Sequence, residues 1–245
     1  MIPRTLIDID ISELPRVETD VAVIGSGIAG LYTALKCAEA GRRVTVIAKK
    51  SLTESNTRYA QGGIAAVVSS TDSPLYHRQD TLIAGAGLCS SEAVDVLVHE
   101  GPDGVKELIR FGTRFDRDDG GDYSLTMEGA HSRRRILHAH GDATGAEIVR
   151  ALAEEVRRRN DGAIEVWDGH FAVDLVTDGG ECCGVIVERP NGERVFVFAH
   201  ATVLCTGGAG QLYRYTTNPE IATGDGIAMA YRAGAYVQDV ELVQF

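Results

Sequence analysis

The sequence lacks the features that mark disulfide-rich, membrane-spanning or secreted proteins. Its five cysteines are scattered and form no CxxC pair, which predicts reduced thiols and no metal site. It contains no apolar run of about 18 residues, the length that crosses a bilayer. The N-terminus also lacks the basic-then-apolar pattern of a secretory signal. Together these absences predict a cytoplasmic protein without a membrane span.

Positive charge is scarce as well. The chain has 24 Lys and Arg against 35 Asp and Glu, a formal net charge of −11. An acidic surface is repelled by phosphate backbones and anionic lipids, so the sequence predicts no nucleic-acid partner. With 245 residues, 44% hydrophobic and 24% charged, the chain is long enough for one large globular domain or two small ones.

Residues 20–48 have the pattern of a strand, a helix and a second strand. The apolar run DVAVI at 20–24 leads into a segment with apolar residues at helical spacing over 28–40, and VTVIA follows at 44–48. Between the first strand and the helix, GSGIAG fits GxGxxG. Its glycines allow a tight turn, close approach of a pyrophosphate, and close packing of helix and strand. The helix N-terminus would present unpaired N–H groups to the phosphates. The predicted dinucleotide-binding residues are Gly25, Ser26, Gly27, Ile28, Ala29 and Gly30.

The second strand lacks the acidic residue that usually bonds a ribose hydroxyl. VTVIA runs instead into Lys49 and Lys50. A lysine at this position could meet the 2′-phosphate of NADP, or the two lysines could be a solvated strand end. The residues alone leave both interpretations open.

The remaining patterns also predict an α/β fold. Amphipathic helices are predicted over 91–111 and 145–159, a further helix over 224–235, and a loop over 68–82. Residues 113–144 show little periodicity, and such a long irregular segment is either functional or disordered. Strand patterns run from 164 to 204, and Asn191-Gly192 is a hairpin signal. The predicted fold is a Rossmann-like domain, a parallel sheet with flanking helices. A small antiparallel β-meander, about 171–199, is inserted before ATVLC returns to the main sheet.

Four blocks of sequence together resemble a known family. They are GSGIAG (25–30), NTRYAQGGIAAV (56–67), EGAHSRRRILHAHGDATG (128–145) and LCTGGAGQLYRYTTNPEIATGDGIAMAYRAGA (204–235). In this order they are similar to the L-aspartate oxidases of the succinate dehydrogenase/fumarate reductase flavoprotein superfamily, and the likeness covers nearly the whole chain. The resemblance implies FAD, not NADP, on the glycine turn. It also implies oxidation of L-aspartate to iminoaspartate in de novo NAD biosynthesis, with electrons passed to oxygen or fumarate.

The resemblance further implies which residues hold FAD. Residues 26–29 would face the pyrophosphate and Lys49 the adenosine side. The ribityl chain and flavin ring would be wrapped by Asn56, Thr57, Arg58, Tyr59, Ala60, Gln61, Gly62 and Gly63. Backbone at Ala172 or Val173 would meet the adenine, Gly207 and Gly208 would form a second glycine turn, and Asp225 would contact the cofactor or act as a helix N-cap. Many family members carry a flavin-linked histidine where this chain has Asn56, so non-covalent FAD is expected.

Glu128 matches the substrate-orienting glutamate of the family. A carboxylate can pair with the α-ammonium group that distinguishes aspartate from succinate, although a surface glutamate in a loop is the alternative. His131 and Arg133 are expected at the substrate, because a guanidinium binds carboxylates bidentately. The histidines of this block lack a metal-ligand pattern. The expected partners are L-aspartate, oxygen or fumarate, and quinolinate synthase as a possible recipient of iminoaspartate.

Family members continue past the point that matches Phe245, with a capping domain, a catalytic arginine and a return segment to the flavin domain. The sequence therefore predicts that residues 1–245 form an incomplete FAD-binding domain, without that capping domain and C-terminal return segment. Such a chain would bind FAD without full activity. Two alternatives stay open: a succinate dehydrogenase/fumarate reductase-type flavoprotein, and a non-catalytic flavin-binding fragment.

Overall fold

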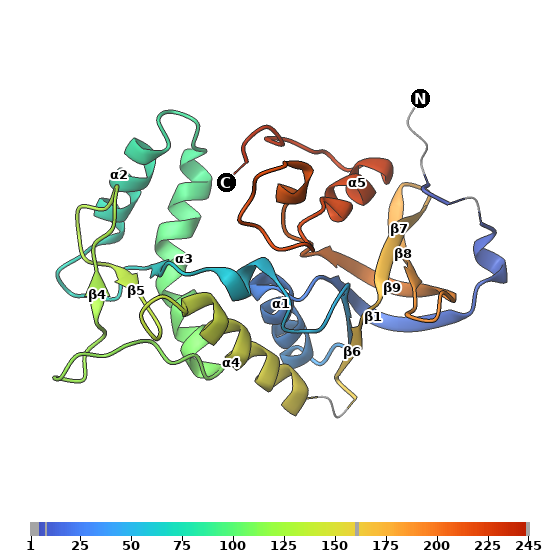
Figure 1. Ribbon diagram of the computed structural model, residues 1–245, viewed down its shortest axis with the longest axis horizontal. Coiled ribbons are helices and arrows are strands. Elements are labelled where there is room, and N and C mark those ends of the chain that lie inside the picture. Colours follow the sequence, from blue (N-terminus) through green and yellow to red (C-terminus); the bar gives the residue numbers. More distant parts are fainter. Residues whose placement is uncertain (1–4, 8, 160–161, 244–245) are drawn as a thin grey trace. The chain divides into compact units, whose positions relative to one another are not determined.

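The computed structural model describes residues 5–7, 9–159 and 162–243 (Figure 1). The chain divides into two compact units. Unit 1 comprises residues 1–57 and 153–245, and unit 2 comprises residues 58–152. Among the described residues, no helix combines the length and the apolar character needed to cross a membrane.

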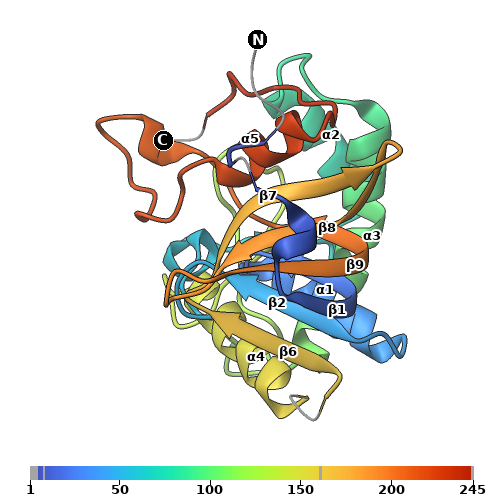
Figure 2. The same ribbon diagram turned by 90° about the vertical axis from the view of Figure 1, so that its right-hand side faces the viewer.

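Unit 1 is built on a six-stranded sheet with the order β6-β2-β1-β9-β8-β7 (Figure 2). The strands are β1 (Arg16–Ile24), β2 (Val44–Ala48), β6 (Ile164–Asp168), β7 (Phe171–Asp178), β8 (Glu181–Glu188) and β9 (Arg194–Leu204). Strands β6, β2, β1 and β9 are parallel, whereas β8 pairs antiparallel with both β7 and β9. This arrangement confirms the predicted α/β fold.

The parallel half of the sheet begins with the predicted strand–helix–strand unit. Helix α1 (Ile28–Glu39) connects β1 to β2, and its apolar face contributes Leu31, Ala34 and Leu35 to the core. Every residue of β2 is buried, as expected for a strand covered on both faces. The local signals were therefore sufficient to locate this unit.

The antiparallel half contains the predicted meander, but the meander is not a separate insert. Strand β9 runs without interruption from Arg194 to Leu204, and β1 pairs along most of its length while β8 pairs with its first part. The prediction that the meander ends near residue 199 and that ATVLC forms a separate strand was wrong at this point. No glycine or proline interrupts residues 194–204, so a single long strand serves both halves of the sheet.

The remaining elements of unit 1 are short. They are the 3₁₀ turns η1 (Ile11–Glu13) and η3 (Gly210–Leu212) and helix α5 (Asp225–Arg232), which contacts β7. Met229 of α5 joins the core formed by the sheet, together with Ile24, Ile47 and Val197. The turn η2 (Asn56–Tyr59) lies at the boundary between the units in the sequence.

Unit 2 contains helices and a small sheet. The helices are α2 (Pro74–Ala84), α3 (Ser91–Arg110) and the first part of α4 (Thr144–Arg158). The antiparallel strands, in the order β3-β5-β4, are β3 (Ile64–Ala65), β5 (Ile136–Leu137) and β4 (Leu125–Thr126). Helices α3 and α4 confirm the amphipathic patterns, and the segment 113–144 is irregular apart from β4 and β5.

The loop predicted over residues 68–82 was wrong, because α2 occupies much of it. The helix starts with two recognisable signals: Ser73 accepts a hydrogen bond from the Tyr76 backbone N–H, and Pro74 stands at the first helical position. Of its residues only His77 is fully buried. A helix with so little buried surface has almost no apolar periodicity, which explains why the pattern was missed.

Candidate functional site: a cavity at the carboxyl ends of the parallel strands

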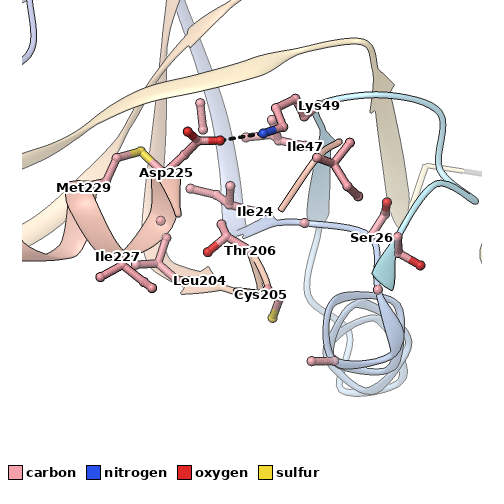
Figure 3. A pocket seen from close by; sticks show the side chains of 18 of the residues that line it. Ile24, Ser26, Ile47, Lys49, Leu204, Cys205, Thr206, Asp225, Ile227 and Met229 are labelled. Carbon is pink, nitrogen blue, oxygen red and sulfur yellow. Dashed lines mark hydrogen bonds and ion pairs between the residues drawn. The ribbon is translucent and has the colours of Figure 1, made fainter. Parts of the chain in front are cut away.

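Unit 1 has a cavity of about 640 Å³ where β1, β2 and β9 end (Figure 3). Its volume lies in the range of small-molecule sites, about 300–1,000 Å³. In open α/β sheets, ligands bind outside the carboxyl ends of the strands, where this cavity lies. The lining includes residues 24–29 of the glycine turn, residues 54–57, residues 170–172 and residues 204–207.

The glycine turn brings three backbone segments together with no room for side chains. Gly25 has φ of +108°, and a Cβ there would collide with the carbonyl of Cys205 at the end of β9. A Cβ at Gly30 would collide with the carbonyl of Gly25. These collisions explain why the first and third positions of the motif are glycines. Helix α1 can approach β1 this closely only where no Cβ atom is present.

The N-terminus of α1 opens on this cavity. Its N-cap, Gly27, offers no side-chain cap, and the backbone N–H of Ile28 donates to Thr57 Oγ1 at 3.1 Å. A Cβ at Gly27 would lie 3.2 Å from the same hydroxyl oxygen. Because Thr57 accepts one N–H of the helix, its own hydroxyl proton could be donated to an anion held at the helix N-terminus.

A hydrogen-bonded ion pair lies on another wall of the cavity. Lys49 Nζ donates to Asp225 Oδ2 at 2.6 Å and to Thr223 Oγ1 at 2.7 Å (Figure 3). Thr223 in turn donates to Asp225 Oδ2 at 2.7 Å. The N-cap of α5 is Gly224, with φ of +76°, and Asp225 is the first residue of the helix. The alternative prediction of Asp225 as the N-cap was therefore wrong.

Most of the cofactor residues predicted in unit 1 line this cavity, with three exceptions: Gly30, Val173 and Gly208. Ala172 and Gly207 are among the lining residues, whereas Val173 and Gly208 are not. The Val173 side chain packs into a second apolar cluster and its carbonyl accepts from Arg232 Nη2. The Gly208 carbonyl accepts from the Gly224 N–H. Of the two candidates for the adenine contact, the structure therefore favours Ala172.

Several lining residues were missed. Glu54, Ser55, His170, Phe171 and Ile221 line the cavity but were not singled out in the sequence. His170 lies in the short connection from β6 to β7 and Phe171 begins β7, whereas Glu54 and Ser55 follow β2 by a few residues. Since strand ends in a parallel sheet meet at one edge, their position after a predicted strand was the available signal.

In unit 2, the predicted flavin segment packs against β5. A Cβ at Gly63 would collide with the Ile136 side chain and the Leu137 carbonyl, and would lie 3.0 Å from His138 Cε1. Gly62 is unconstrained, and the Ala60 carbonyl accepts from the Gly145 N–H. The flavin contacts predicted for residues 58–63 remain predictions.

The three substrate residues predicted in unit 2 have different surroundings. Glu128 is half exposed, and its Oε1 lies 3.1 Å from His138 Nε2. The Arg133 guanidinium is exposed and stacks 4.8 Å from the centre of the Tyr76 ring. His131 Nδ1 accepts from Arg135 Nη1 at 3.1 Å. Glu128 and Arg133 are therefore accessible, whereas one ring nitrogen of His131 is already in use.

Arg135 is fully buried between two carboxylates. Its guanidinium donates to Asp72 at 2.7 and 2.9 Å and to Asp80 at 2.6 Å. Burial alone would raise the pKa of Asp72, but hydrogen bonds from Arg135 and the Ser73 backbone outweigh it and hold that pKa below its ordinary value. We call Arg135, Asp72, Asp80 and His131 the Arg135 cluster. Its arginine is occupied by protein carboxylates and serves the structure of unit 2.

Comparison with known proteins identifies the family. The FAD-binding domain family model matches residues 20–245, which is most of the chain. The chain belongs to the FAD-binding domain family. The prediction of FAD as the cofactor is thus confirmed, and the glycine turn, the helix N-terminus and the volume of the cavity all suit a dinucleotide.

The FAD-binding domain is similar to several named proteins. It is 50% identical over 94% of the chain to an L-aspartate oxidase of Streptomyces coelicolor, and 48% identical over 92% to L-aspartate oxidase 1 of Ralstonia nicotianae. The chain spans 40% and 43% of the lengths of these relatives. Among solved structures, the E. coli quinol fumarate reductase matches with a TM-score of 0.84 and 34% identity over 89% of this chain and 37% of that one. The predicted resemblance is confirmed.

Proposed function

We propose that this chain is the FAD-binding part of an enzyme that oxidises L-aspartate to iminoaspartate in NAD biosynthesis. The observation that carries the proposal is the identity of about half of all residues, over more than nine-tenths of the chain, with relatives named L-aspartate oxidase. The fumarate reductase has lower identity, 34%. On this proposal, residues 1–245 supply most of the cofactor site and part of the substrate site of the whole protein.

The residues of unit 1 would hold FAD through its phosphates and adenosine. The N–H groups at the start of α1 and the Thr57 hydroxyl would face the pyrophosphate, and Lys49, paired with Asp225, would lie on the adenosine side. Ala172 would lie at the adenine. Asn56 supports non-covalent attachment, because its amide donates to Asn218 Oδ1 at 3.0 Å and offers no nucleophile to the flavin.

FAD, when bound, supplies the acceptor for the two electrons removed from the substrate. L-Aspartate loses the hydrogen on Cα with both electrons and one proton from nitrogen, which leaves the C=N bond of iminoaspartate. Oxygen is then reduced to hydrogen peroxide, or fumarate to succinate, so that atoms and electrons balance. Glu128 would bind the α-ammonium group, and Arg133 would bind a carboxylate.

The proposal extends to the fate of the product and to the compartment. An imine hydrolyses in water, which supports direct transfer of iminoaspartate to quinolinate synthase. All five cysteines are free in the structure, and free thiols suit the reducing cytoplasm.

The second candidate is a fumarate reductase or succinate dehydrogenase activity, favoured by the structural match to the quinol fumarate reductase. The two functions are separated by substrate preference in the intact protein. Oxidation of L-aspartate with formation of peroxide supports the first, and oxidation of succinate without oxidation of aspartate supports the second. A protein that binds FAD but oxidises neither substrate would favour the hypothesis of a non-catalytic flavin-binding fragment.

A direct test of the substrate role replaces Glu128 with glutamine in the intact protein. Loss of a desolvated charge pair costs at least about 2 kcal/mol, so kcat/KM for L-aspartate should fall about 30-fold or more. Fumarate has no ammonium group, and its reduction should change less than about threefold. Glu100→Gln, an exposed position on α3, is the matched control. Equal losses for aspartate and fumarate would contradict the role of Glu128.

A further inference from the structure

His138 lies beside Glu128, the glutamate proposed to bind the substrate. Its Nε2 lies 3.1 Å from Glu128 Oε1 and 2.9 Å from Thr126 Oγ1. Thr126 ends β4 and His138 directly follows β5, and these two strands pair with Thr126 opposite Ile136. The small sheet of unit 2 therefore brings the imidazole to the loop that carries Glu128, ten positions earlier in the chain.

The contact between His138 and Glu128 has a defined direction. An ionised carboxylate can only accept hydrogen bonds, so Nε2 must carry a proton to donate to Glu128, and Thr126 Oγ1 at 2.9 Å is a second acceptor for the same proton. His138 Nδ1 is buried and has no hydrogen-bond partner among the described residues. The tautomer with its proton on Nε2 leaves a lone pair, not an unpaired N–H, at this buried atom. That tautomer is the one that can donate to Glu128.

The imidazole ring also lies close to the Gly63 backbone. An added Cβ at Gly63 would lie only 3.0 Å from His138 Cε1 and would collide with Ile136 and the Leu137 carbonyl. Gly63 immediately precedes β3, which pairs with β5. The hydrogen bond with Thr126 and the close approach of the Gly63 backbone both restrict the ring.

Glu128 has no comparable support of its own. Its side chain is 49% exposed and lies outside the regular elements of the fold. His138 Nε2 lies within ion-pair distance of this carboxylate, 3.1 Å from Oε1, and is itself held by a hydrogen bond with Thr126. A half-exposed glutamate in a loop samples several rotamers, and a fixed donor to one oxygen restricts them.

We propose that His138 is a positioning residue, which fixes the Glu128 carboxylate so that its second oxygen can receive the ammonium group of an amino-acid substrate. The inference rests on the proposed function and adds a residue that determines substrate specificity. His138 acts through Glu128, so its effect should be confined to substrates that carry the ammonium group.

The test uses a matched pair of substitutions in the intact, FAD-loaded protein. The amide nitrogen of His138→Gln can reach the place of Nε2 and donate to Glu128, whereas the shorter His138→Asn cannot. A lost hydrogen bond to a charged group corresponds to about a tenfold effect. We expect KM for L-aspartate to rise about tenfold in His138→Asn and less than about threefold in His138→Gln. KM for fumarate should stay within about twofold in both. His99→Leu, an exposed histidine on α3, is the control.

A double-mutant cycle separates positioning from general damage. If His138 acts through Glu128, His138→Asn should add almost nothing to the loss already caused by Glu128→Gln. Bound FAD, measured by absorbance, should equal that of the unmodified protein. Three results would each overturn the inference: an unchanged KM for aspartate in His138→Asn, equal losses for aspartate and fumarate, or additive losses in the double variant. Failure of the proposed function would show differently, because the unmodified FAD-loaded protein would then not oxidise aspartate at all.

Discussion

Removing the buried guanidinium of the Arg135 cluster should lower the free energy of unfolding of unit 2 substantially. In Arg135→Met, the Asp72 carboxylate, 1% exposed, and the Asp80 carboxylate, 11% exposed, lose three hydrogen bonds from the guanidinium. Breaking a buried ion pair by removing one partner costs about 3–5 kcal/mol. Asp72 keeps the Ser73 N–H, and Asp80 keeps the backbone and hydroxyl of Ser132, which places the expected cost near the lower end, at about 3 kcal/mol.

Hydrogen exchange of the amides in α2 and β5 measures this loss within unit 2, because the protection of these amides reports the free energy of opening. Arg134→Met is the control: its guanidinium is exposed and lies 3.5 Å from the Leu125 carbonyl, so it should cost less than about 0.5 kcal/mol. Adding Asp72→Asn and Asp80→Asn to Arg135→Met should recover at least half of the loss, since no buried charge is then left unpaired. A loss below about 1 kcal/mol in Arg135→Met would refute the reasoning.

The same cluster predicts a reversal of pH dependence. The pKa of Asp72 is below its ordinary value of 3.8, as burial, which raises it, is outweighed by the hydrogen bonds. Its stabilising contribution is therefore complete above that value and is lost as the pH falls through the lower, folded-state pKa. In Arg135→Met, burial without the cation raises the pKa above the unfolded value, so the variant should gain stability as the pH falls from neutral toward about 4. A variant that loses stability in parallel with the unmodified protein would contradict this explanation.

Two further predictions concern the cavity of unit 1. Gly30→Ala should lower FAD affinity and reduce the free energy of unfolding by about 1–3 kcal/mol, because the new Cβ would collide with the Gly25 carbonyl. The control Gly104→Ala, whose Cβ meets nothing within 4 Å, should stabilise α3 by up to about 1 kcal/mol. Thermal unfolding and flavin titration check both variants. Lys49→Met should change stability by less than about 1 kcal/mol, because the ion pair with Asp225 is about a third exposed, but should weaken FAD binding about tenfold. Equal FAD affinity in the two proteins would remove Lys49 from the cofactor site.

The parts of the fold that the sequence predicted are those specified by neighbouring residues. The strand–helix–strand unit over 16–48 follows from apolar periodicity and from glycines whose missing Cβ atoms are needed within the same turn. Helix α2 was missed because its residues bury too little apolar surface to show a period, although Ser73 and Pro74 mark its start. Strand β9 was divided in two because its partners change along its length, which only the pairing with β1 and β8 reveals.

The candidate site was predictable where a motif lies in one segment and not where it is assembled from distant ones. Lys49 and Asp225 were each singled out, yet the contact between them, 176 positions apart, depends on α5 returning to the end of β2. Thr223, which joins them, carries no signal of its own in the sequence. Lys49, which its neighbours in the sequence could assign to the 2′-phosphate of NADP, is instead paired with the Asp225 carboxylate.

The block at 128–138 shows why a motif cannot be transferred as a whole. Its charged residues are close together in sequence, but burial divides them into different roles. Arg135 is buried and neutralised by two aspartates, Arg133 is exposed over Tyr76, and Glu128 is half exposed beside His138. Burial decides the outcome, because a buried guanidinium that is neutralised by two protein carboxylates is not accessible to a dicarboxylate, whereas an exposed one is. The substrate chemistry of this block should therefore depend on Glu128, Arg133 and the positioning of Glu128 by His138, and the loss caused by Arg135→Met should be a loss of fold.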